Sequence, residues 1–329
     1  MRIAIVWPGI AVSMGDCWRE LAKRHEVRIW VEPGLVEQEF NGSELHGLDW
    51  CRISDTALPT AYIEIKSFEP DAMLICGCAT PIARMAAKID VKCRKIIQFD
   101  MRRRNPLGKI LAKFLLWPRL RRFDAAFVPG RRALVYAEWL GFKGRVAMGS
   151  TPSGWERFSS VRPAARGFVF VGRFTEEKGI GVLFGAYERY REAVKDPWDL
   201  SVVGTGLLFV PDTKGLNVVG FVPPEKMPEV FGRHAALVMP SFWEPWGISA
   251  MEAMSAGMMT IATDECGFTG DFEPTAEFVA GDIDGLSKAM VKVHNMTEAE
   301  RAGESERARG IAMRYSCPRW VEKLENLIS

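Results

Sequence analysis

The stretch from Met239 to Thr263, MPSFWEPWGISAMEAMSAGMMTIAT, constrains the fold more than any other part of the chain. It begins where the apolar run Ala235–Met239 ends, and a proline then leads into a loop of polar and aromatic residues. From Ile248 the apolar residues recur at helical spacing, and Gly257 stands where a glycine commonly ends a helix. A second apolar run, Met258–Ala262, follows directly. The pattern predicts a strand, a loop, a helix and a second strand, the unit that leaves a helix N-terminus open above a parallel sheet.

The chemistry expected of this unit follows from its polar groups. The backbone N–H groups of Gly247, Ile248 and Ser249 would lie at the helix N-terminus, where partial positive charge favours an anion such as a diphosphate. Glu244 precedes the helix, and Glu252 lies about one turn inside it. Two carboxylates beside a phosphate are unfavourable unless they accept hydrogen bonds from hydroxyl groups, which a ribose and a sugar both supply. The alternative is one solvated helix glutamate and one loop charge at chance spacing.

The rest of the chain alternates apolar runs with helical patterns, which indicates parallel sheets with right-handed crossovers. In residues 1–150 we expect strands at Arg2–Trp7, Val27–Val31, Asp71–Cys76, Lys95–Phe99, Ala125–Val128 and Arg145–Met148. The helices expected there are Asp16–Arg24, with Asp16 as its N-cap, Pro81–Ile89 and Arg131–Leu140. A linker rich in Ser, Pro and Gly is expected at 151–166. The alternation restarts at Gly167–Val171 and continues with strands at Leu200–Val203 and Asn217–Val219 and helices at Gly179–Val194, Glu225–His234, 297–313 and 316–328. The predicted fold class is α/β, with two Rossmann-like domains at 1–150 and 167–315.

Composition narrows the class of partner. The 329 residues carry a net charge of only +2, which argues against a nucleic-acid-binding protein. The seven cysteines are odd in number and lack small-domain spacing, so reduced thiols in a cytosol are expected. No run reaches the roughly 18 apolar residues of a membrane span, and the N-terminus is too briefly apolar for a signal peptide. We therefore expect a cytoplasmic protein, soluble or peripheral at the inner face of the membrane.

A second motif, FVFVGRFTEEKGI, opens the second half of the chain. Its strand ends at Gly172, and the following loop carries Arg173 and Lys178 before the next helix. Two cations there would neutralise a diphosphate from the side opposite the helix that starts at Ile248. Taken alone, the two residues are equally explained as ordinary surface charge.

Four motifs occur in order over about ninety residues: FVFVGRFTEEKGI, LSVVGTG, VVGFVPPEKMPEVF and SFWEPWGISAMEAMSAG. In order and spacing they resemble the donor-lobe motifs of the retaining, nucleotide-sugar-dependent glycosyltransferases of family 4. The resemblance covers most of the second half. It implies the GT-B fold, in which two Rossmann-like domains face a central cleft, the first binding the acceptor and the second the donor. It also implies that the C-terminal helix, 316–329, crosses back to the first domain.

The same resemblance implies roles for individual residues of the second half. Arg173 and Lys178 would hold the donor diphosphate, Glu244 would contact hydroxyls of the transferred sugar, and Glu252 would contact the ribose. The donor would be a UDP- or GDP-sugar, with no metal and no other cofactor. The leaving phosphate would assist the incoming hydroxyl on the same face, so retention would need no protein nucleophile.

Backbone groups complete the donor site that the resemblance implies. The amides near Trp246, Gly247 and Ile248 would meet the sugar and the phosphates. Gly204 and Gly206 would allow close approach of the nucleotide, and the backbone of Phe221 and Val222 would border the base. Trp243 and Trp246 are candidates for stacking on sugar rings, although tryptophan is also common in protein cores.

The first half departs from the family pattern. Gly9, Gly15 and Asp16 are the candidates for the glycine-rich loop that the family carries after its first strand, on the acceptor side. At the end of a middle strand, Phe99 stands where the family has a histidine, and Asp100 follows it. Either Asp100 takes over part of the contact of that histidine, or the donor sugar lacks the hydroxyl that it meets, as a 6-deoxy sugar or a pentose does.

Three further patterns suggest other functions. Asp282-Ile283-Asp284 spells the metal–diphosphate motif of the other major glycosyltransferase fold, but Asp284 fits better as the N-cap of a following helix, Leu286–Val293. Gly204 and Gly206 begin a dinucleotide fingerprint that Phe209 breaks. Cys76 and Cys78 form the closest cysteine pair, without the histidines of a metal site.

Residues 102–123, RRRNPLGKILAKFLLWPRLRRF, carry eight Arg or Lys and no acidic residue. Such a basic amphipathic segment fits contact with an anionic membrane, and some relatives act on lipid-linked acceptors. A core-packed helix with a solvated outer face explains the segment equally well.

The sequence therefore predicts a glycosyltransferase that moves a hexosyl, deoxyhexosyl or pentosyl group from a nucleotide sugar to a glycan or lipid-linked acceptor. Two alternatives remain. One is a GT-B nucleotide-sugar epimerase, and the other is a catalytically silent protein that binds nucleotide sugars or glycans.

Overall fold

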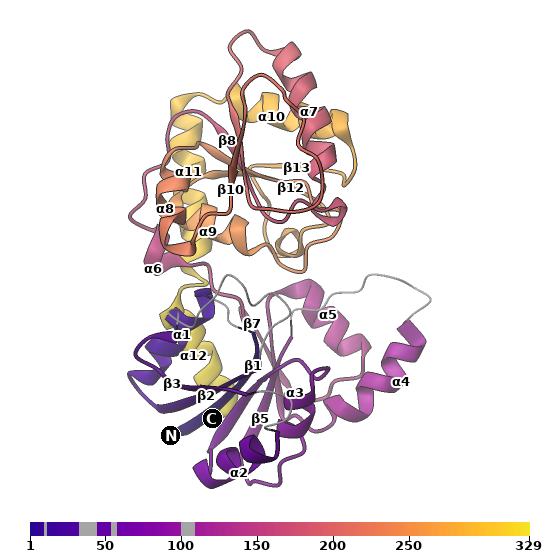
Figure 1. Cartoon of the computed structure of the whole chain (residues 1–329), viewed down its shortest axis with the longest axis vertical. Helices are drawn as coiled ribbons and strands as arrows, with labels where there is room; N and C mark the ends of the chain where they lie inside the picture. The colour runs from indigo at the N-terminus through magenta and orange to yellow at the C-terminus, as the bar shows by residue number, and fades with distance from the viewer. Residues whose placement is uncertain (10–11, 33–44, 54–57, 100–108) are drawn as a thin grey trace. The chain divides into compact units, whose positions relative to one another are not determined.

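The computed structural model describes residues 1–9, 12–32, 45–53, 58–99 and 109–329. These residues form two compact units (Figure 1). The first unit comprises Met1–Pro152 together with Cys317–Ser329, and the second comprises Ser153–Ser316. Each unit is an α/β domain built on one parallel sheet.

The sheet of the first unit has seven strands in the order β3-β2-β1-β4-β5-β6-β7. Their bounds are Arg2–Pro8 (β1), Glu26–Glu32 (β2), Asp49–Arg52 (β3), Ala72–Cys76 (β4), Arg94–Gln98 (β5), Ala125–Val128 (β6) and Arg145–Met148 (β7). All six neighbouring pairs are parallel. The order reverses between β1 and β4, which is the arrangement of doubly wound domains.

Helices cover both faces of this sheet, and those before the C-terminal helix lie between its strands along the chain. Their bounds are Val12–Ala22 (α1), Leu58–Phe68 (α2), Pro81–Ala86 (α3), Lys109–Leu120 (α4), Arg131–Trp139 (α5) and Cys317–Ile328 (α12). Alternation along β1 divides the core, since Ile3 and Ile5 belong to one buried cluster and Ala4 and Val6 to the other.

The second unit repeats this plan with six parallel strands in the order β10-β9-β8-β11-β12-β13. The strands are Phe168–Val171 (β8), Leu200–Val203 (β9), Leu216–Gly220 (β10), Ala236–Met239 (β11), Met259–Thr263 (β12) and Ala276–Phe278 (β13). The α-helices are Trp155–Phe158 (α6), Ile180–Ala193 (α7), Met227–Gly232 (α8), Ile248–Ala256 (α9), Ile283–His294 (α10) and Glu298–Met313 (α11). The 3-10 turns are Glu176–Lys178 (η3), Pro224–Lys226 (η4) and Gly267–Gly270 (η5). The two predicted Rossmann-like domains are therefore confirmed.

The C-terminal helix α12 packs on the first unit beside α1 (Figure 1). Trp320 is fully buried, its ring centroid lies 5.5 Å from that of Phe127, and its Nε1 donates a hydrogen bond to the Ser150 carbonyl at 2.8 Å. The thiols of Cys17 and Cys317 are both buried, and their sulfur atoms lie 2.9 Å apart. Burial of this large apolar face fixes the last thirteen residues to the sheet.

Several local expectations are wrong. Asp16 does not cap the first helix, because α1 begins at Val12; its carboxylate instead pairs with Arg19 at 2.5 Å. The N-cap of α10 is Asp282, whose Oδ1 accepts from the Gly285 N–H at 2.9 Å, whereas Asp284 pairs with Arg189.

The range 151–166, predicted as a linker, belongs mostly to the second unit. It contains α6, and Phe158 of that helix is fully buried, 5.2 Å from the ring of Phe231. Three further elements, β3, α2 and β13, were not predicted, because they are too short or too mixed in polarity to show a clear period.

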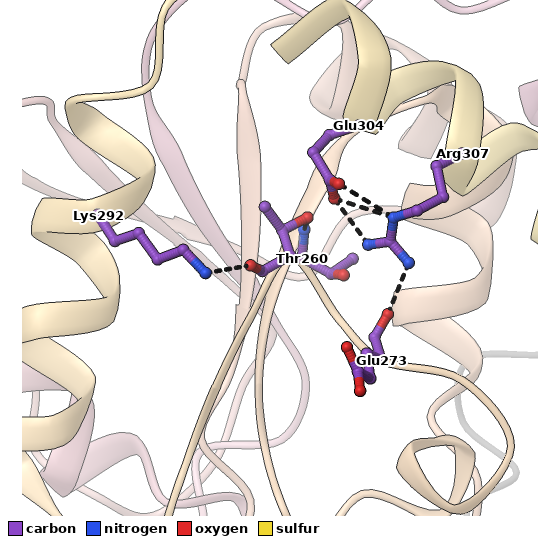
Figure 2. Close-up of polar contacts among 6 residues, drawn as sticks. Thr260, Glu273, Lys292, Glu304 and Arg307 are labelled. Atoms are coloured by element: carbon purple, nitrogen blue, oxygen red, sulfur yellow. Dashed lines mark hydrogen bonds and ion pairs between the residues drawn. The ribbon is translucent and has the colours of Figure 1, made fainter. Parts of the chain in front are cut away.

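Polar contacts fasten the β12–β13 edge of the second sheet to the helices beside it (Figure 2). Lys292 of α10 donates to the Thr275 carbonyl at 3.2 Å, and the Thr275 hydroxyl accepts from the Thr260 N–H at 3.1 Å. Arg307 of α11 donates to the Glu273 carbonyl, just before β13, at 2.9 Å, and to Glu304 of the same helix at 2.6 Å, which lowers the pKa of the Glu304 carboxyl group. These bonds hold the last strand of the sheet, which is only three residues long.

We predict that Trp320→Ala destabilises the first unit by about 3–5 kcal/mol, because it removes a fully buried ring and one of the two hydrogen bonds that the Ser150 carbonyl accepts, the other coming from Gln98. Urea unfolding followed by circular dichroism measures this loss. The matched control is Trp117→Ala, since Trp117 is 43% exposed, and its loss is expected to stay below about 1 kcal/mol. Equal losses in the two variants would contradict the packing of α12 described above.

A second prediction concerns pH. Burial lowers the pKa of His234 below its ordinary value of 6.5, with its Nδ1 bonded to the Val230 carbonyl and its Nε2 to the Ser201 hydroxyl. The folded state therefore favours the neutral ring, so this contribution is present above pH 6.5 and is lost as the pH falls through the lowered pKa. Burial also lowers the pKa of His294, so its contribution to stability is likewise lost as the pH falls.

We expect the free energy of unfolding of the second unit to fall between pH 7.5 and 5.5, and His234→Gln to flatten part of that fall. Urea titrations at several pH values measure both slopes. His46→Gln, at an exposed position of the first unit, is the control and is expected to change neither. An unchanged pH slope in His234→Gln would show that the ring is not held neutral in the folded state.

Candidate functional site

The candidate site lies at the carboxyl ends of β8 and β11, where the strand order of the second sheet reverses. The chain leaves these two adjacent strands toward opposite sides of the sheet, and ligands of open α/β sheets bind at this point. The loop after β8 carries Arg173 and Lys178, and the loop after β11 carries Glu244. The sheet thus brings together three residues that the sequence assigned to one site.

The two loops touch through their backbones. The Phe242 N–H donates to the Glu177 carbonyl at 2.9 Å. Gly179 has a φ of +68°, and a β-carbon at this position would overlap the Pro240 carbonyl oxygen. A glycine is therefore required here for both its conformation and its space.

Lys178 and Glu244 form an ion pair across these loops. Lys178 Nζ lies 2.5 Å from Glu244 Oε2, and the two side chains are 19% and 14% exposed. The backbone of Glu244 is held by the loop after β12, since its N–H donates to Glu265 and its carbonyl accepts from Gly267. The two residues were assigned to different parts of the donor, yet the structure pairs them.

Arg173 differs from Lys178 in its surroundings. It is exposed, and within the described chain its side chain makes no hydrogen bond or ion pair. Its position after β8 suits a cation that meets an anion from solvent.

Helix α9 begins beside this pair. Its N-cap, Gly247, has a φ of +113° and supplies no side-chain cap, so the first turn presents N–H groups at Ile248 and Ser249. A β-carbon at Gly247 would lie 2.9 Å from the Phe268 ring, so the glycine is also fixed by space. Ile248 is 43% exposed at this helix end.

Glu252, on the second turn of α9, has a partner that the sequence analysis missed. Arg157 of α6 donates from Nη2 to Glu252 Oε1 at 3.0 Å, and the side chains are 20% and 15% exposed. The two residues are 95 positions apart, so no spacing in the sequence indicates the contact.

Trp246 takes a different place from the one expected for a stacking residue. It is 3% exposed, and its ring packs against Phe272 and Tyr315. The side chain of Trp246 is therefore core, and only its backbone can face a ligand. Trp243 is half-buried in the same loop.

Gly204 and Gly206 lie beside the loop after β8. A β-carbon on Gly204 would overlap the Gly172 carbonyl oxygen, and one on Gly206 would overlap that of Phe174. The packing of the β8 and β9 loops therefore explains both glycines without a ligand. Downstream of β10, Phe221 is 43% exposed, and Val222 is half-buried at the edge of the core.

The residues expected on the acceptor side lie in the first unit. Gly9 has a φ of +81° after β1, and its N–H donates to the Glu32 carbonyl at 2.8 Å. Gly15 and Asp16 lie inside α1, not in the loop where they were placed. Phe99 is 7% exposed and belongs to a core cluster, so a buried ring stands where a histidine was expected. Asp100 lies outside the described residues.

The basic segment 102–123 is described from residue 109 onward, mostly as α4. Leu120 and Phe123 are buried in the core of the first unit. Trp117 is 43% exposed, with the Arg121 guanidinium 4.7 Å from its ring centroid. The C-terminal part of the segment is thus packed at one face and charged at the other, and membrane contact stays a prediction. No helix in the described ranges is long and apolar enough to cross a membrane.

Other candidate sites carry no ligand chemistry. Within the described residues, no cluster of His, Cys, Asp and Glu could hold a metal ion, and this includes Asp282, Asp284, Cys76 and Cys78. A hollow of about 600 Å³ lies between α10 and α11, at the amino ends of β12 and β13. Its lining residues are Thr275, Lys292, Asn295, Met296, Glu300, Gly303 and Glu304. The charged side chains there are already bonded within the chain, and we assign it no ligand.

Comparison with known proteins identifies a domain in the second half of the chain. Residues 156–307 match the family described as Glycosyl transferases group 1, so the second unit carries a domain of this kind. The search of curated proteins found no match to this sequence at a significant level.

Solved structures of similar fold cover the whole chain. The apo form of the lipopolysaccharide outer core galactosyltransferase WaaB is 14% identical, with a TM-score of 0.72 over 100% of this chain and 99% of that one. An E. coli trehalose-6-phosphate structure bound with UDP-2-fluoro glucose is 12% identical, with a TM-score of 0.77 over 100% and 99%. Anabaena HepE in complex with UDP and glucose is 11% identical, with a TM-score of 0.74 over 99% and 98%. The fold is that of GT-B glycosyltransferases.

The contact between the two loops predicts the effect of a single methyl group. Gly179→Ala is expected to destabilise the second unit by about 2–4 kcal/mol, because alanine is strained at this φ and its β-carbon meets Pro240. Gly181→Ala, two residues further on in α7, is the matched control. Nothing lies within 4 Å of its added β-carbon, so it is expected to be neutral or stabilising by up to about 1 kcal/mol. Thermal unfolding of both variants gives the comparison, and a stable Gly179→Ala would mean that the loops do not touch.

Proposed function

We propose that the protein is a retaining glycosyltransferase that moves a sugar from a nucleotide-diphosphate sugar to a hydroxyl of a glycan or lipid-linked acceptor. One observation carries the proposal: the pairs Lys178–Glu244 and Arg157–Glu252 flank the N-terminus of α9 within a glycosyl transferases group 1 domain. Two carboxylates, two cations and a helix N-terminus match a ligand that is hydroxylated at both ends and anionic in the middle. A nucleotide sugar has this distribution of groups.

The base of the donor is proposed to be uracil or guanine. Support for uracil comes from HepE, which is bound with UDP and glucose, and from the E. coli structure bound with UDP-2-fluoro glucose. The exposed side of Phe221 and the backbone of Val222 would border the base, because they follow the strand next to β9 at the same edge of the sheet.

Lys178 and Arg173 would neutralise the diphosphate. An ammonium group has three donors, so Lys178 can keep Glu244 while it binds a phosphate oxygen. Arg173 would add a second cation from the solvent side, and the N–H groups at Ile248 and Ser249 would meet the phosphates from the other side. The negative charge that grows on the leaving diphosphate would then be stabilised by groups already in place.

The transfer step needs no protein nucleophile. The bond from the anomeric carbon to the diphosphate oxygen breaks, and the acceptor oxygen bonds to the same face of that carbon. The acceptor proton passes to an oxygen of the leaving phosphate. Catalysis would then rest on positioning and charge stabilisation, without a metal ion.

The first unit would bind the acceptor through the segment that follows β1, including Gly9, Gly15 and Asp16. The buried Phe99 supports a donor sugar that needs no histidine contact, such as a 6-deoxy sugar or a pentose. Asp100 is the alternative contact. The seven free cysteines support a reducing, cytoplasmic setting.

The test is a thermal-shift panel with UDP, GDP, ADP and dTDP on wild type, Glu252→Ala and Glu306→Ala. A nucleotide at about 100 times its Kd adds roughly 2.7 kcal/mol to the folded state. We expect UDP or GDP to raise the melting temperature of the wild type, and Glu252→Ala to weaken that shift. Glu306 is exposed on α11 and belongs to neither ion pair of the site, so Glu306→Ala is expected to retain the shift.

Activity decides between an enzyme and a silent binder. With the matching nucleotide sugar and EDTA, slow donor hydrolysis is expected in the absence of acceptor. With a hydroxyl acceptor, NMR of the glycoside that forms should show the anomeric configuration of the donor. Nucleotide binding without sugar release would favour the silent binder that the buried Phe99 suggests. An epimerised sugar as the product would favour the epimerase. Absence of any nucleotide shift would contradict the donor site itself.

A further inference from the structure

Arg157 stands outside every motif of the donor site, yet it contacts the site directly. It lies on α6, a helix of four residues that begins after Gly154, whose φ is +68°. Its Nη2 donates to Glu252 Oε1 at 3.0 Å, and its guanidinium lies 5.1 Å from the ring centroid of Phe158. A β-carbon on Gly154 would lie 3.2 Å from Glu252 Cγ, so the chain approaches this carboxylate closely.

We infer that Arg157 is a positioning residue for the nucleotide ribose, acting through the carboxylate of Glu252. The inference rests on the proposed function, in which Glu252 accepts hydrogen bonds from the ribose hydroxyls. Arg157 fixes one oxygen of that carboxylate. A carboxylate accepts about four hydrogen bonds, so a bond from Arg157 is compatible with bonds from two hydroxyls.

The packing of α6 holds Arg157 in place. Phe158 is fully buried and lies 5.2 Å from the ring of Phe231 on α8, in a cluster that also contains Met251 of α9. The Ser153 carbonyl, just before α6, accepts from the Ser255 hydroxyl of α9 at 2.9 Å. Because α6 is fastened to α8 and α9, the orientation that Arg157 gives to Glu252 is set before any ligand binds.

The charge of Arg157 has a second effect on nucleotide binding. Glu252 is partly buried, and its negative charge opposes the approach of a diphosphate. Arg157 compensates that charge, as Lys178 compensates Glu244 in the neighbouring loop. Each glutamate of the donor site thus has one cation from another segment of the second unit.

A purely structural role for the pair makes a different prediction. An ion pair that only ties α6 to α9 would change stability when it is broken, and would leave the preference for ribose over deoxyribose unchanged. The ratio of the two affinities therefore separates the two roles.

The experiment is a double-mutant cycle on the full chain with wild type, Arg157→Gln, Glu252→Gln and the double variant. Calorimetry gives the Kd of UDP or GDP, whichever binds the wild type more tightly, and of its 2′-deoxy form. We expect Arg157→Gln to weaken binding of the ribonucleotide about tenfold, which corresponds to the loss of one charge-assisted hydrogen bond. Binding of the 2′-deoxy form should weaken by less. In the Glu252→Gln background, Arg157→Gln should lower the affinity for the ribonucleotide by less than about twofold.

Two further variants serve as controls for an indirect effect on folding. Arg157→Lys keeps the charge without the planar fork, so its affinity should lie between that of wild type and Arg157→Gln. Arg166→Gln removes an exposed arginine that pairs with Asp196, and it should bind as wild type does. Melting temperatures without nucleotide show whether each variant is folded.

The outcomes are distinct. Equal weakening of the ribose and deoxyribose forms by Arg157→Gln, or weakening that persists undiminished without Glu252, would overturn the role of Arg157. If Arg157→Gln binds the ribonucleotide as tightly as the wild type does, the role of Arg157 is also overturned, while the proposed function stands. Failure of the wild type to bind any of the nucleotides would overturn the proposed function, and the role of Arg157 with it.

Discussion

The reversal of strand order between β8 and β11 is the constraint on which the candidate site depends. All strands of the second sheet are parallel, so their carboxyl ends share one edge, and neighbouring loops there usually turn to the same side. At the reversal, the helices that follow the two loops lie on opposite faces of the sheet, α7 in one core cluster and α9 in the other, and ligands of open α/β sheets bind at this edge. Arg173, Lys178 and Glu244 occupy these two loops.

Close backbone contact sets the separation of these loops, and this separation allows their side chains to form an ion pair. Gly179 and Gly204 each stand where a β-carbon would strike a carbonyl oxygen of a neighbouring loop. With the loops this close, Lys178 reaches Glu244 at 2.5 Å. Partly buried carboxylates require compensation, and the fold provides one cation for each of the two glutamates. The arrangement is charged but locally balanced, which suits a ligand that brings both hydroxyls and phosphates.

The sequence predicted the two α/β domains and the polar residues of the loops after β8 and β11 because both signals are local. Apolar runs of strand length and the glycine at position 257 can be read within a few residues, and the structure has the expected strands and a left-handed cap there. The wrong predictions arose where a local signal was overridden by packing. Asp16 resembles an N-cap, but burial of Met14 and neighbouring residues extends α1 back to Val12. Trp246 lies in a polar loop, but Tyr315, which covers it, is distant in sequence.

By itself, the sequence determined which chemical groups follow which strand, because periodicity, turns and motif spacing are properties of neighbouring residues. Only the tertiary structure decided their partners. Lys178 meets Glu244 across 66 positions and Arg157 meets Glu252 across 95, and both pairings depend on the order of strands in the sheet. That order is fixed by burial of both sheet faces over the whole unit, a non-local energy that no single stretch of residues contains.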